Sequence, residues 1–432
     1  MKKDKYKIGA RTAMALVISS MVGTGVFTSL GFQLAEVQNT WSIILLWVVG
    51  GGIALIGAIT YAELGTHFTQ SGGDYIFLSR SFHPIVGYLY AWTSLTVGFS
   101  APVAIAALAM SDYLATPLDL GAMAKWIGPI VIIMLSVIQS TTLKTAGTFQ
   151  DLSSLLKVLF VLALILIGVV FSTHEAAALD FSASWTHEVW KPGFAVSLIY
   201  VSYAYQGWNQ SAYIVEEIRN PLKNLPISLI GGTLLVTLLY VCINLVMLKH
   251  ATQEQLIGQA DVATISFGNI LGSRGVYWIS TLIALQLLAT ISSYIWIGSR
   301  VTQAMASEHP LWKPLAKKSK TNIPVRAIWF QTIISLALIL VGSLEQVMLY
   351  AGFLLQITST LTILSVFFIK PKPGTYKSPF GRKLQVIYIL FSIIVTIYIL
   401  YERPFESISG LTILAVGLLS YFIKPKKSSL SH

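Results

Sequence analysis

Long apolar stretches, separated by short polar segments, fill almost the whole chain. A helix that crosses a lipid bilayer needs about 20 mainly apolar residues, and we identify twelve such stretches. They cover residues 9–36, 41–65, 83–113, 124–142, 150–172, 192–216, 226–249, 273–306, 325–342, 345–369, 383–402 and 405–423. The pattern predicts an all-α integral membrane protein with twelve transmembrane helices. The first stretch is too long for a signal peptide and lacks a cleavage pattern of small residues, so we expect a retained helix.

The composition narrows the class of protein. Of the 432 residues, 55% are hydrophobic and only 11% are charged, whereas soluble domains carry about 25% charged residues. A water-soluble enzyme is therefore excluded, and so is a nucleic-acid-binding protein, despite the net charge of +11. The single cysteine, Cys242, excludes a disulfide framework and a cysteine-based zinc or iron–sulfur site. We expect no cofactor and no bound metal.

The distribution of basic residues predicts the orientation in the membrane. Twelve crossings place both termini on one side, and if that side is the cytoplasm it holds 23 of the 29 Lys and Arg residues. The outer side then holds five, and Lys157 lies within a stretch. Cytoplasmic loops carry such an excess of Lys and Arg. We expect a multi-pass protein that lies in the lipid bilayer of the cell (plasma) membrane with cytoplasmic termini. The basic segments are explained as cytoplasmic loops without any anionic partner, and binding of lipid head groups is the alternative.

Two of the stretches are interrupted by residues that disfavour a helix. Residues 19–27 read SSMVGTGVF, and each glycine costs a helix roughly 1 kcal/mol relative to alanine. Close helix packing by small residues is the alternative explanation. Residues 200–209 read YVSYAYQGWN, a polar and aromatic segment with a glycine where apolar residues are expected. Because the two breaks lie in the first and the sixth stretch, they hold equivalent places in two five-helix halves, which is typical of a substrate site near the membrane midplane.

The breaks also indicate the chemistry of the substrate. A half-helix that starts near Gly25 presents free N–H groups and the positive end of its dipole, which suits a carboxylate. Carbonyls released at residues 18–20 and 202–205 suit an ammonium group. A carboxylate and an ammonium group close together describe an α-amino acid. Tyr203, Tyr205 and Trp208 are candidate aromatic lids over it, although each is also explained as a core or interfacial aromatic residue.

Short motifs in order along nearly the whole chain resemble the amino acid–polyamine–organocation (APC) transporter superfamily, and within it the L-type amino acid transporter family. The motifs are VGTGVF at 22–27, YAELG at 61–65, SGGDY at 71–75, GWN at 207–209, EEIRNP at 216–221, LP at 225–226, SR at 299–300 and IPVRA at 323–327.

The resemblance implies a fold and an activity. The fold would consist of two inverted five-helix repeats, at residues 1–172 and 192–369, with discontinuous helices 1 and 6, followed by two further helices at residues 383–423. The activity would be sodium-independent amino acid transport by alternating access, as an exchanger. The residues that would bind the substrate are Ser20, Gly23, Thr24, Gly25, Tyr203, Ala204, Gln206, Asn209 and Tyr240.

The resemblance also assigns coupling and gating residues. Tyr203 matches an outer aromatic gate, and Trp208 and Asn244 would take part in gating. Two departures affect the choice of substrate: Gln206 stands where relatives often have a small residue, and residues 289–294 of helix 8 lack an Asn-Gly pair. The outer loop between helices 3 and 4 has no cysteine, so we expect no disulfide-linked heavy chain of the kind found in animal members.

Lys157, within the fifth stretch, is the one basic residue expected at membrane depth. A lysine there is a functional candidate by default, unless it snorkels to the cytoplasmic interface. By resemblance, its ammonium group takes the place of a sodium ion and touches helix-1 carbonyls such as that of Ser20. The charges at helix ends are candidate latches of an inner gate or simple end-capping residues. They are Glu63, Glu216, Glu217 and Arg300.

Other functions fit the sequence less well. An intramembrane enzyme would need clustered His, Asp, Glu or Cys residues, and the seven histidines lie at helix ends, in loops or at the terminus. A channel would need repeated filter rings, and a sensor would need a soluble output domain. Within transport, a proton-coupled amino acid symporter and a transporter of polyamines or cationic amino acids stay open. No acidic residue is visible in mid-membrane, which favours neutral amino acids.

Overall fold

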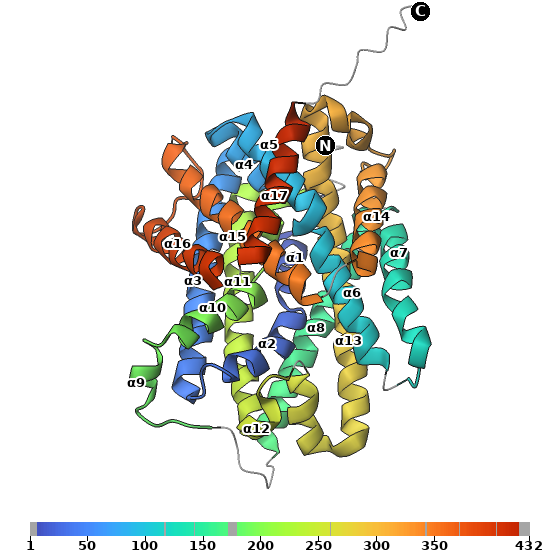
Figure 1. The fold of residues 1–432 in the computed structure, drawn as a ribbon. Helices are drawn as coiled ribbons and strands as arrows, with labels where there is room; N and C mark the ends of the chain where they lie inside the picture. The colour runs from blue at the N-terminus through green and yellow to red at the C-terminus, as the bar shows by residue number, and fades with distance from the viewer. Residues whose placement is uncertain are drawn as a thin grey trace, which may run out of the picture.

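The computed structural model describes residues 7–115, 118–141, 143–171, 179–259, 261–341, 344–370, 372–402 and 404–422, and the molecule is an assembly of helices (Figure 1). Within these residues, β pairing is limited to a single bridge between Ile8 and Ile218. The all-helical architecture that the apolar pattern predicts is therefore confirmed for the described part of the chain.

Within the part of the chain that the structure describes, the helices follow one another without an intervening domain. In order they are α1 Ala10–Met21, α2 Thr24–Leu34, α3 Thr40–Phe68, α4 Asp74–Ser81, α5 Pro84–Thr93, η2 Ser94–Gly98, α6 Ser100–Ala115, η3 Gly121–Trp126, α7 Ile127–Gln139, α8 Leu143–Val170, α9 Trp185–Glu188, α10 Pro192–Ala204, η4 Gln210–Glu217, α11 Pro221–Lys249, α12 Gln253–Leu256, α13 Val262–Glu308, η5 Pro310–Ala316, α14 Val325–Val341, α15 Leu344–Ser365, η6 Val366–Phe368, α16 Lys383–Glu402 and α17 Pro404–Tyr421.

Eight helical segments of the described residues are long and apolar enough to cross a membrane. They are Ala10–Leu34, Thr40–Phe68, Pro84–Ala115, Gly121–Gln139, Thr145–Val170, Pro221–Lys249, Val262–Glu308 and Lys383–Tyr401. Four shorter apolar helices accompany them: Pro192–Ala204, Val325–Leu340, Phe353–Phe368 and Ser407–Tyr421. Each segment overlaps one of the predicted stretches. The bounds differ most at α10, which ends twelve residues before the end of the stretch predicted to residue 216, and at α13, which begins eleven residues before the stretch predicted from residue 273.

Local sequence explains where several helices begin. The Asn39 side chain accepts a hydrogen bond from the Trp41 amide at 2.9 Å and so caps the start of α3. Proline occupies the first turn of α5, α10 and α11. An N–H group at this position has no partner within the helix, so proline, which lacks one, costs no helical hydrogen bond.

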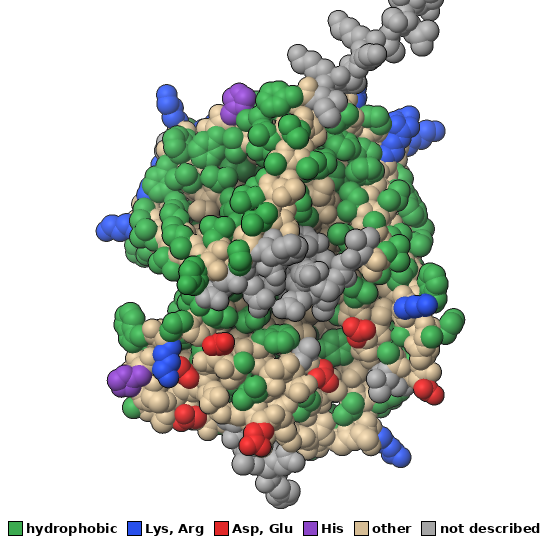
Figure 2. Space-filling model, viewed as in Figure 1, with side chains coloured by type: hydrophobic (Ala, Val, Ile, Leu, Met, Phe, Trp, Pro, Cys, Tyr) green, Lys and Arg blue, Asp and Glu red, His purple; other side chains and the backbone are tan. Residues whose placement is uncertain are grey.

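Helices α1, α3, α8, α11 and α13 pack against one another around the interrupted segments, and α6 lies along α13. Apolar side chains also cover the outside of the bundle, as Figure 2 shows for one face. Leu166 of α8, Leu234 of α11 and Ile394 of α16 are each about 60% exposed to solvent in the isolated molecule. Such a surface suits hydrocarbon rather than water.

The bundle has two distinct ends (Figure 1). Helices α4 and α5 lie at one end, which we call the α4 end, and the short helices α9 and α12 lie at the other, which we call the α12 end. On the face drawn in Figure 2, the acidic side chains gather in the half toward the α12 end.

Candidate functional site

The interruption in the first stretch separates two helices. Helix α1 ends at Met21, Val22 and Gly23 are not helical, and α2 begins at Thr24. The first amides of a helix have no partner within that helix, and no side chain caps the start of α2. The amides of Thr24 and Gly25 and the positive end of the α2 dipole therefore face the gap.

The interruption in the sixth stretch lies directly against the first. Helix α10 ends at Ala204, the 3₁₀ helix η4 begins at Gln210, and Gly207 between them has a φ of +107°. A β-carbon at residue 207 would lie 2.7 Å from Cβ of Ser20 and 2.8 Å from its carbonyl carbon. Glycine is thus required both by the backbone conformation and by the close approach of the two breaks.

A pocket lies where the two breaks meet. Seven residues predicted from the sequence line it: Ser20, Gly23, Thr24, Gly25, Tyr203, Ala204 and Gln206. Further lining residues come from α6, α13 and α15 and were not among the predicted site residues. They are Pro102, Ile105, Ala106, Thr290, Tyr294 and Leu355, together with Met21 of α1. Apolar residues in a long helix give no signal of their own, and Thr290 and Tyr294 lie in the segment 289–294, which the resemblance linked only to the choice of substrate.

The carbonyls at the end of α1 are not all available to a ligand. A helix leaves its last four carbonyls without a helical partner. Here the Ile18 carbonyl accepts from the Val22 amide at 2.9 Å, and the Met21 carbonyl accepts from the Tyr240 hydroxyl at 2.6 Å. Ser19 accepts from Lys157 at 2.9 Å. Within the described residues, the Ser20 carbonyl is the one of the four without a hydrogen-bond partner, and Ser20 lines the pocket.

Lys157 of α8 is completely buried, with 0% of its side chain exposed. Its ammonium group donates to the carbonyls of Ser19 and Val22, and to the Thr290 hydroxyl at 2.7 Å. These three oxygens match its three N–H donors. The carbonyl predicted as a partner was that of Ser20, and the structure replaces it with those of Ser19 and Val22, which flank it in the unwound segment. The side chain therefore does not snorkel to a surface.

Comparison with known proteins agrees with this geometry. A sequence profile of the family described as "Amino acid permease" matches residues 8–418. The chain belongs to the amino acid permease family. It is 26% identical over 428 residues to the mouse b(0,+)-type amino acid transporter 1, covering 96% of this chain and 87% of the relative. It is also 27% identical over 435 residues to the rabbit large neutral amino acids transporter small subunit 2, covering 97% of this chain and 80% of the relative.

Membership of this family agrees with the resemblance that the short motifs indicate, and it makes the protein a transporter rather than an enzyme. The relatives are amino acid transporters of the L-type and b(0,+) kind, and they support amino acid transport by this permease.

Other predicted residues of the permease lie around the pocket rather than in it. The Tyr240 hydroxyl lies 2.6 Å from the Met21 carbonyl and 3.1 Å from the Ala204 carbonyl, so it bridges the ends of α1 and α10. Asn244, one turn further along α11, donates to the Tyr240 carbonyl at 2.8 Å. Neither residue belongs to the pocket lining.

The three candidate lids occupy different places. Tyr203 lines the pocket. Tyr205 is buried, and its hydroxyl donates to the Trp47 carbonyl of α3 at 2.8 Å. Trp208 is also buried and packs edge-on against Tyr61 of α3, with ring centroids 4.8 Å apart. Tyr205 and Trp208 therefore point into the helix core, which corresponds to the alternative explanation that the sequence left open.

Gln206 and Asn209 lie at and directly after the break in the sixth stretch. They line a second, smaller pocket together with Gln210, Tyr213 and Tyr294, and Gln206 and Tyr294 line both pockets. Asn209 donates to the Tyr213 hydroxyl at 2.9 Å. The segment between α10 and η4 is thus polar from the first pocket to the second.

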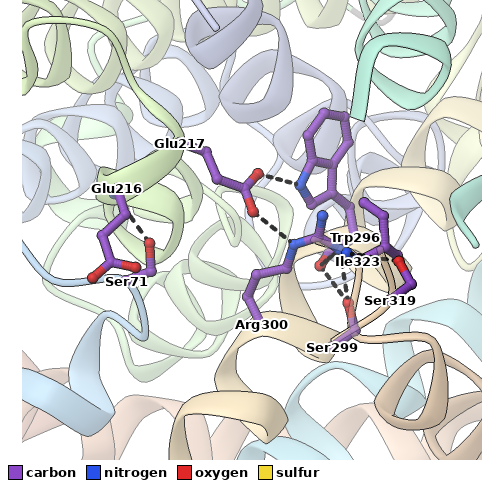
Figure 3. Close-up of polar contacts among 8 residues, drawn as sticks. All are labelled: Ser71, Glu216, Glu217, Trp296, Ser299, Arg300, Ser319 and Ile323. Atoms are coloured by element: carbon purple, nitrogen blue, oxygen red, sulfur yellow. Dashed lines mark hydrogen bonds and ion pairs between the residues drawn. The ribbon is translucent and has the colours of Figure 1, made fainter. Parts of the chain in front are cut away.

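Charged side chains join several elements at the α4 end (Figure 3). Arg300 of α13 donates to Glu217 of η4 at 3.0 Å, and the indole of Trp296 donates to the same carboxylate at 3.2 Å. Ile8 also pairs with this segment, donating to the Glu217 carbonyl and accepting from the Arg219 amide, both at 2.8 Å. We call this group of contacts the η4 latch.

The other charges expected at helix ends are arranged differently. Glu63 pairs with Arg382 at 2.9 Å, which ties α3 to the segment before α16. Glu216 takes part in none of the ion pairs of the described residues, and its amide donates to the Ser71 hydroxyl at 3.0 Å (Figure 3).

Proposed function

We propose that this permease is a sodium-independent secondary transporter of neutral amino acids. It carries them across the plasma membrane by alternating access, as an exchanger. The proposal rests on the pocket between the two helix breaks and on the contacts that Lys157 makes with the unwound segment beside that pocket.

The two ends of an amino acid have complementary groups in the pocket. The carboxylate would be bound by the amides at the start of α2, near Thr24 and Gly25, where the helix dipole is positive. The ammonium group would donate to the Ser20 carbonyl, which has no other partner in the described part of the chain. Both groups lie on the backbone, so they recognise the part that all amino acids share.

The observation that carries the proposal is the set of contacts made by Lys157. A buried cation is held by three oxygens, two of them carbonyls of the unwound segment between α1 and α2. Carbonyl and hydroxyl oxygens are also the ligands that hold alkali cations in transporters with broken helices. With a fixed ammonium group in this place, the unwound segment needs no sodium ion to satisfy its carbonyls.

The pocket wall favours uncharged side chains. None of the residues that line it carries a formal charge, and its polar side chains are uncharged hydroxyl and amide groups, those of Ser20, Thr24, Tyr203, Gln206, Thr290 and Tyr294. A cationic side chain entering this space would leave water without meeting a carboxylate, which is costly. Gln206, which lines both pockets, is placed to select among neutral side chains.

The proposal includes a membrane topology. We infer twelve crossings, two five-helix repeats at residues 1–172 and 192–369, two further helices at residues 383–423, and cytoplasmic termini. The α4 end would then face the cytoplasm. The only cysteine, Cys242, lies within α11, so we expect no disulfide-linked heavy chain.

Uptake by the purified protein in proteoliposomes tests this function. Labelled leucine should accumulate in vesicles preloaded with unlabelled leucine, without sodium, and much less in empty vesicles. Labelled lysine and putrescine should be carried poorly, and Gln206→Gly should change the order of preference among neutral amino acids. Uptake of putrescine but not leucine would contradict the proposed substrate, and equal uptake by empty and preloaded vesicles would contradict exchange.

A further inference from the structure

Asp74 brings a carboxyl group into the interior of the bundle. The sequence places it in the loop after the second stretch, but the structure makes it the first residue of α4 and leaves it 1% exposed. The hydroxyl of Tyr61 donates to one of its oxygens and that of Tyr213 to the other. None of the ion pairs among the described residues involves Asp74.

The groups that face Asp74 from the surrounding helices are nearly all uncharged phenols. They are Tyr61 of α3, Tyr90 of α5, Tyr213 of η4 and Tyr388 of α16, with the Thr362 hydroxyl of α15. Arg80 of α4 forms its ion pair with Glu308 of α13, to which the Tyr75 hydroxyl also donates. Helix α4 lies outside the candidate membrane spans, and burial raises the pKa of the Asp74 carboxyl above its usual range although the phenols donate to it.

The hydrogen bonds of this cluster are complete only when Asp74 is ionised. Tyr61 and Tyr213 donate to the carboxylate, and the hydroxyl of Tyr90 lies 2.7 Å from that of Tyr213, to which it can donate. Asn209 donates to Tyr213 as well. A proton on Asp74 turns one of its acceptor oxygens into a donor, so the hydrogen bond to that oxygen has to reverse its direction or break.

Among the residues around Asp74, Tyr213 is the one that belongs to the interrupted sixth stretch. It lies in η4, directly after the break, and it lines the second pocket together with Tyr90 and Asn209. A rearrangement at Tyr213 therefore changes the wall of the space that adjoins the candidate amino acid site and loosens the tie between η4 and helices α3 and α4.

We propose that Asp74 is a proton-binding site, and that its protonation is coupled to movement of η4 and thereby to amino acid binding. The inference rests on the proposed function, because it assigns a second, ionic ligand to the same transport cycle. In this cycle the ionised Asp74 carboxylate holds η4 against α3 and α4, and binding of a proton to this carboxylate releases η4.

Calorimetry of leucine binding to the purified protein tests the proposal. Titrations between pH 5.5 and 7.5 in two buffers with different enthalpies of protonation give the number of protons exchanged for each leucine bound. We expect a non-zero number for the parent protein and zero for Asp74→Asn, which keeps the shape of the side chain without its titration. The matched control is Asp119→Asn, at an exposed loop residue, and should behave as the parent does.

Tyr213→Phe provides a second, independent test if Asp74→Asn fails to fold. It removes one donor to the ionised carboxylate, so the pH range of proton exchange should move upward by about one unit. Leucine binding without proton exchange in the parent protein would overturn the proposal and leave amino acid transport intact. Proton exchange that persists in Asp74→Asn, or an unmoved pH range in Tyr213→Phe, would overturn it too. The absence of any heat of leucine binding would instead contradict the proposed substrate.

Discussion

Gly207 lies so close to Ser20 that a β-carbon at residue 207 would come within 2.7 Å of the Ser20 side chain. The breaks in the first and the sixth stretch, which are almost two hundred residues apart in the chain, therefore form one structural unit. The Tyr240 hydroxyl joins the same unit, because it contacts the carbonyls of Met21 and Ala204 at the ends of α1 and α10.

This arrangement predicts different effects for two tyrosines. Tyr240→Phe removes the hydroxyl shared by both breaks, whereas Tyr205→Phe removes a hydroxyl that donates to the Trp47 carbonyl of α3. Each loss should lower the free energy of unfolding by about 1 kcal/mol, because a buried hydrogen bond to a backbone carbonyl is removed.

Only Tyr240→Phe should also reduce the rate of leucine exchange, by ten-fold or more, when both variants are compared at equal amounts of reconstituted protein. Equal transport defects in the two variants would show that the contact of Tyr240 with the breaks has no special role.

Two glycines at the start of α2 should respond differently to alanine. A β-carbon on Gly25 would lie 2.7 Å from the α-carbon of Ala204, whereas one on Gly23 would lie 3.6 Å from Thr290, an ordinary contact. Gly25→Ala should therefore separate α2 from α10 and destabilise the protein by roughly 1–3 kcal/mol.

Gly23→Ala should leave the melting temperature nearly unchanged and weaken leucine binding, because the added methyl group enters the pocket wall. Thermal denaturation and binding of labelled leucine measure the two effects. A Gly25→Ala protein as stable as its parent would contradict the close contact between α2 and α10.

The η4 latch predicts a change in accessibility at the α4 end. Glu217→Gln removes the charge that pairs with Arg300, a residue that is only 4% exposed, and should weaken the latch by roughly 2 kcal/mol. A cysteine introduced in place of the buried Val215, in a Cys242→Ala background, should then react at least ten-fold faster with a polar thiol reagent.

The control is Glu308→Gln, which breaks the exposed pair between Arg80 and Glu308 and should change the reaction rate of the cysteine little. The same increase in both variants would mean that the latch holds no more tightly than a surface ion pair.

Topology is tested by single cysteines in the Cys242→Ala background. Cysteines in place of Lys318 and Lys372 should be labelled only from the cytoplasm, and a cysteine in place of Glu254 only from outside. The reason is the excess of basic residues predicted on the cytoplasmic side. Labelling of whole cells with an impermeant reagent, before and after lysis, distinguishes the sides, and the reverse pattern would invert the proposed orientation.

The sequence predicts the breaks well and the surroundings of the breaks poorly. Glycine and polar residues in an apolar stretch disfavour a continuous helix wherever they occur, so both interruptions follow from local chemistry. The rotation of each helix about its own axis does not follow from the local sequence. Trp208 points toward Tyr61 instead of the pocket, and Ala204 fills the space beside Gly25.

The least predictable feature is the position of Asp74. A carboxylate in a polar loop motif is most simply interpreted as solvated, and only the path of the chain at the start of α4 brings it among the phenols of Tyr61 and Tyr213. Thr290 presents a similar case. The sequence shows no link between this threonine of α13 and Lys157 of α8, and only the packing of the two helices brings them into contact.

Lys157 carries the central claim that transport needs no sodium. Lys157→Ala removes three donors, and the Thr290 hydroxyl, which lies 3.1 Å from the Ser19 carbonyl and 3.2 Å from the Val22 carbonyl, can replace only one of them. A carbonyl is left without a partner at a cost of about 1–3 kcal/mol, which is enough to shift a balanced equilibrium between two conformations about ten-fold.

The most direct measurement is leucine exchange in sodium-free proteoliposomes, by the parent protein and by Lys157→Ala at equal reconstituted amounts and with unchanged size-exclusion profiles. We predict rapid exchange by the parent and near-complete loss in the variant. A parent protein that requires sodium, or a variant that still exchanges leucine at the parent's rate, would contradict the assignment of Lys157 as the built-in cation of this permease.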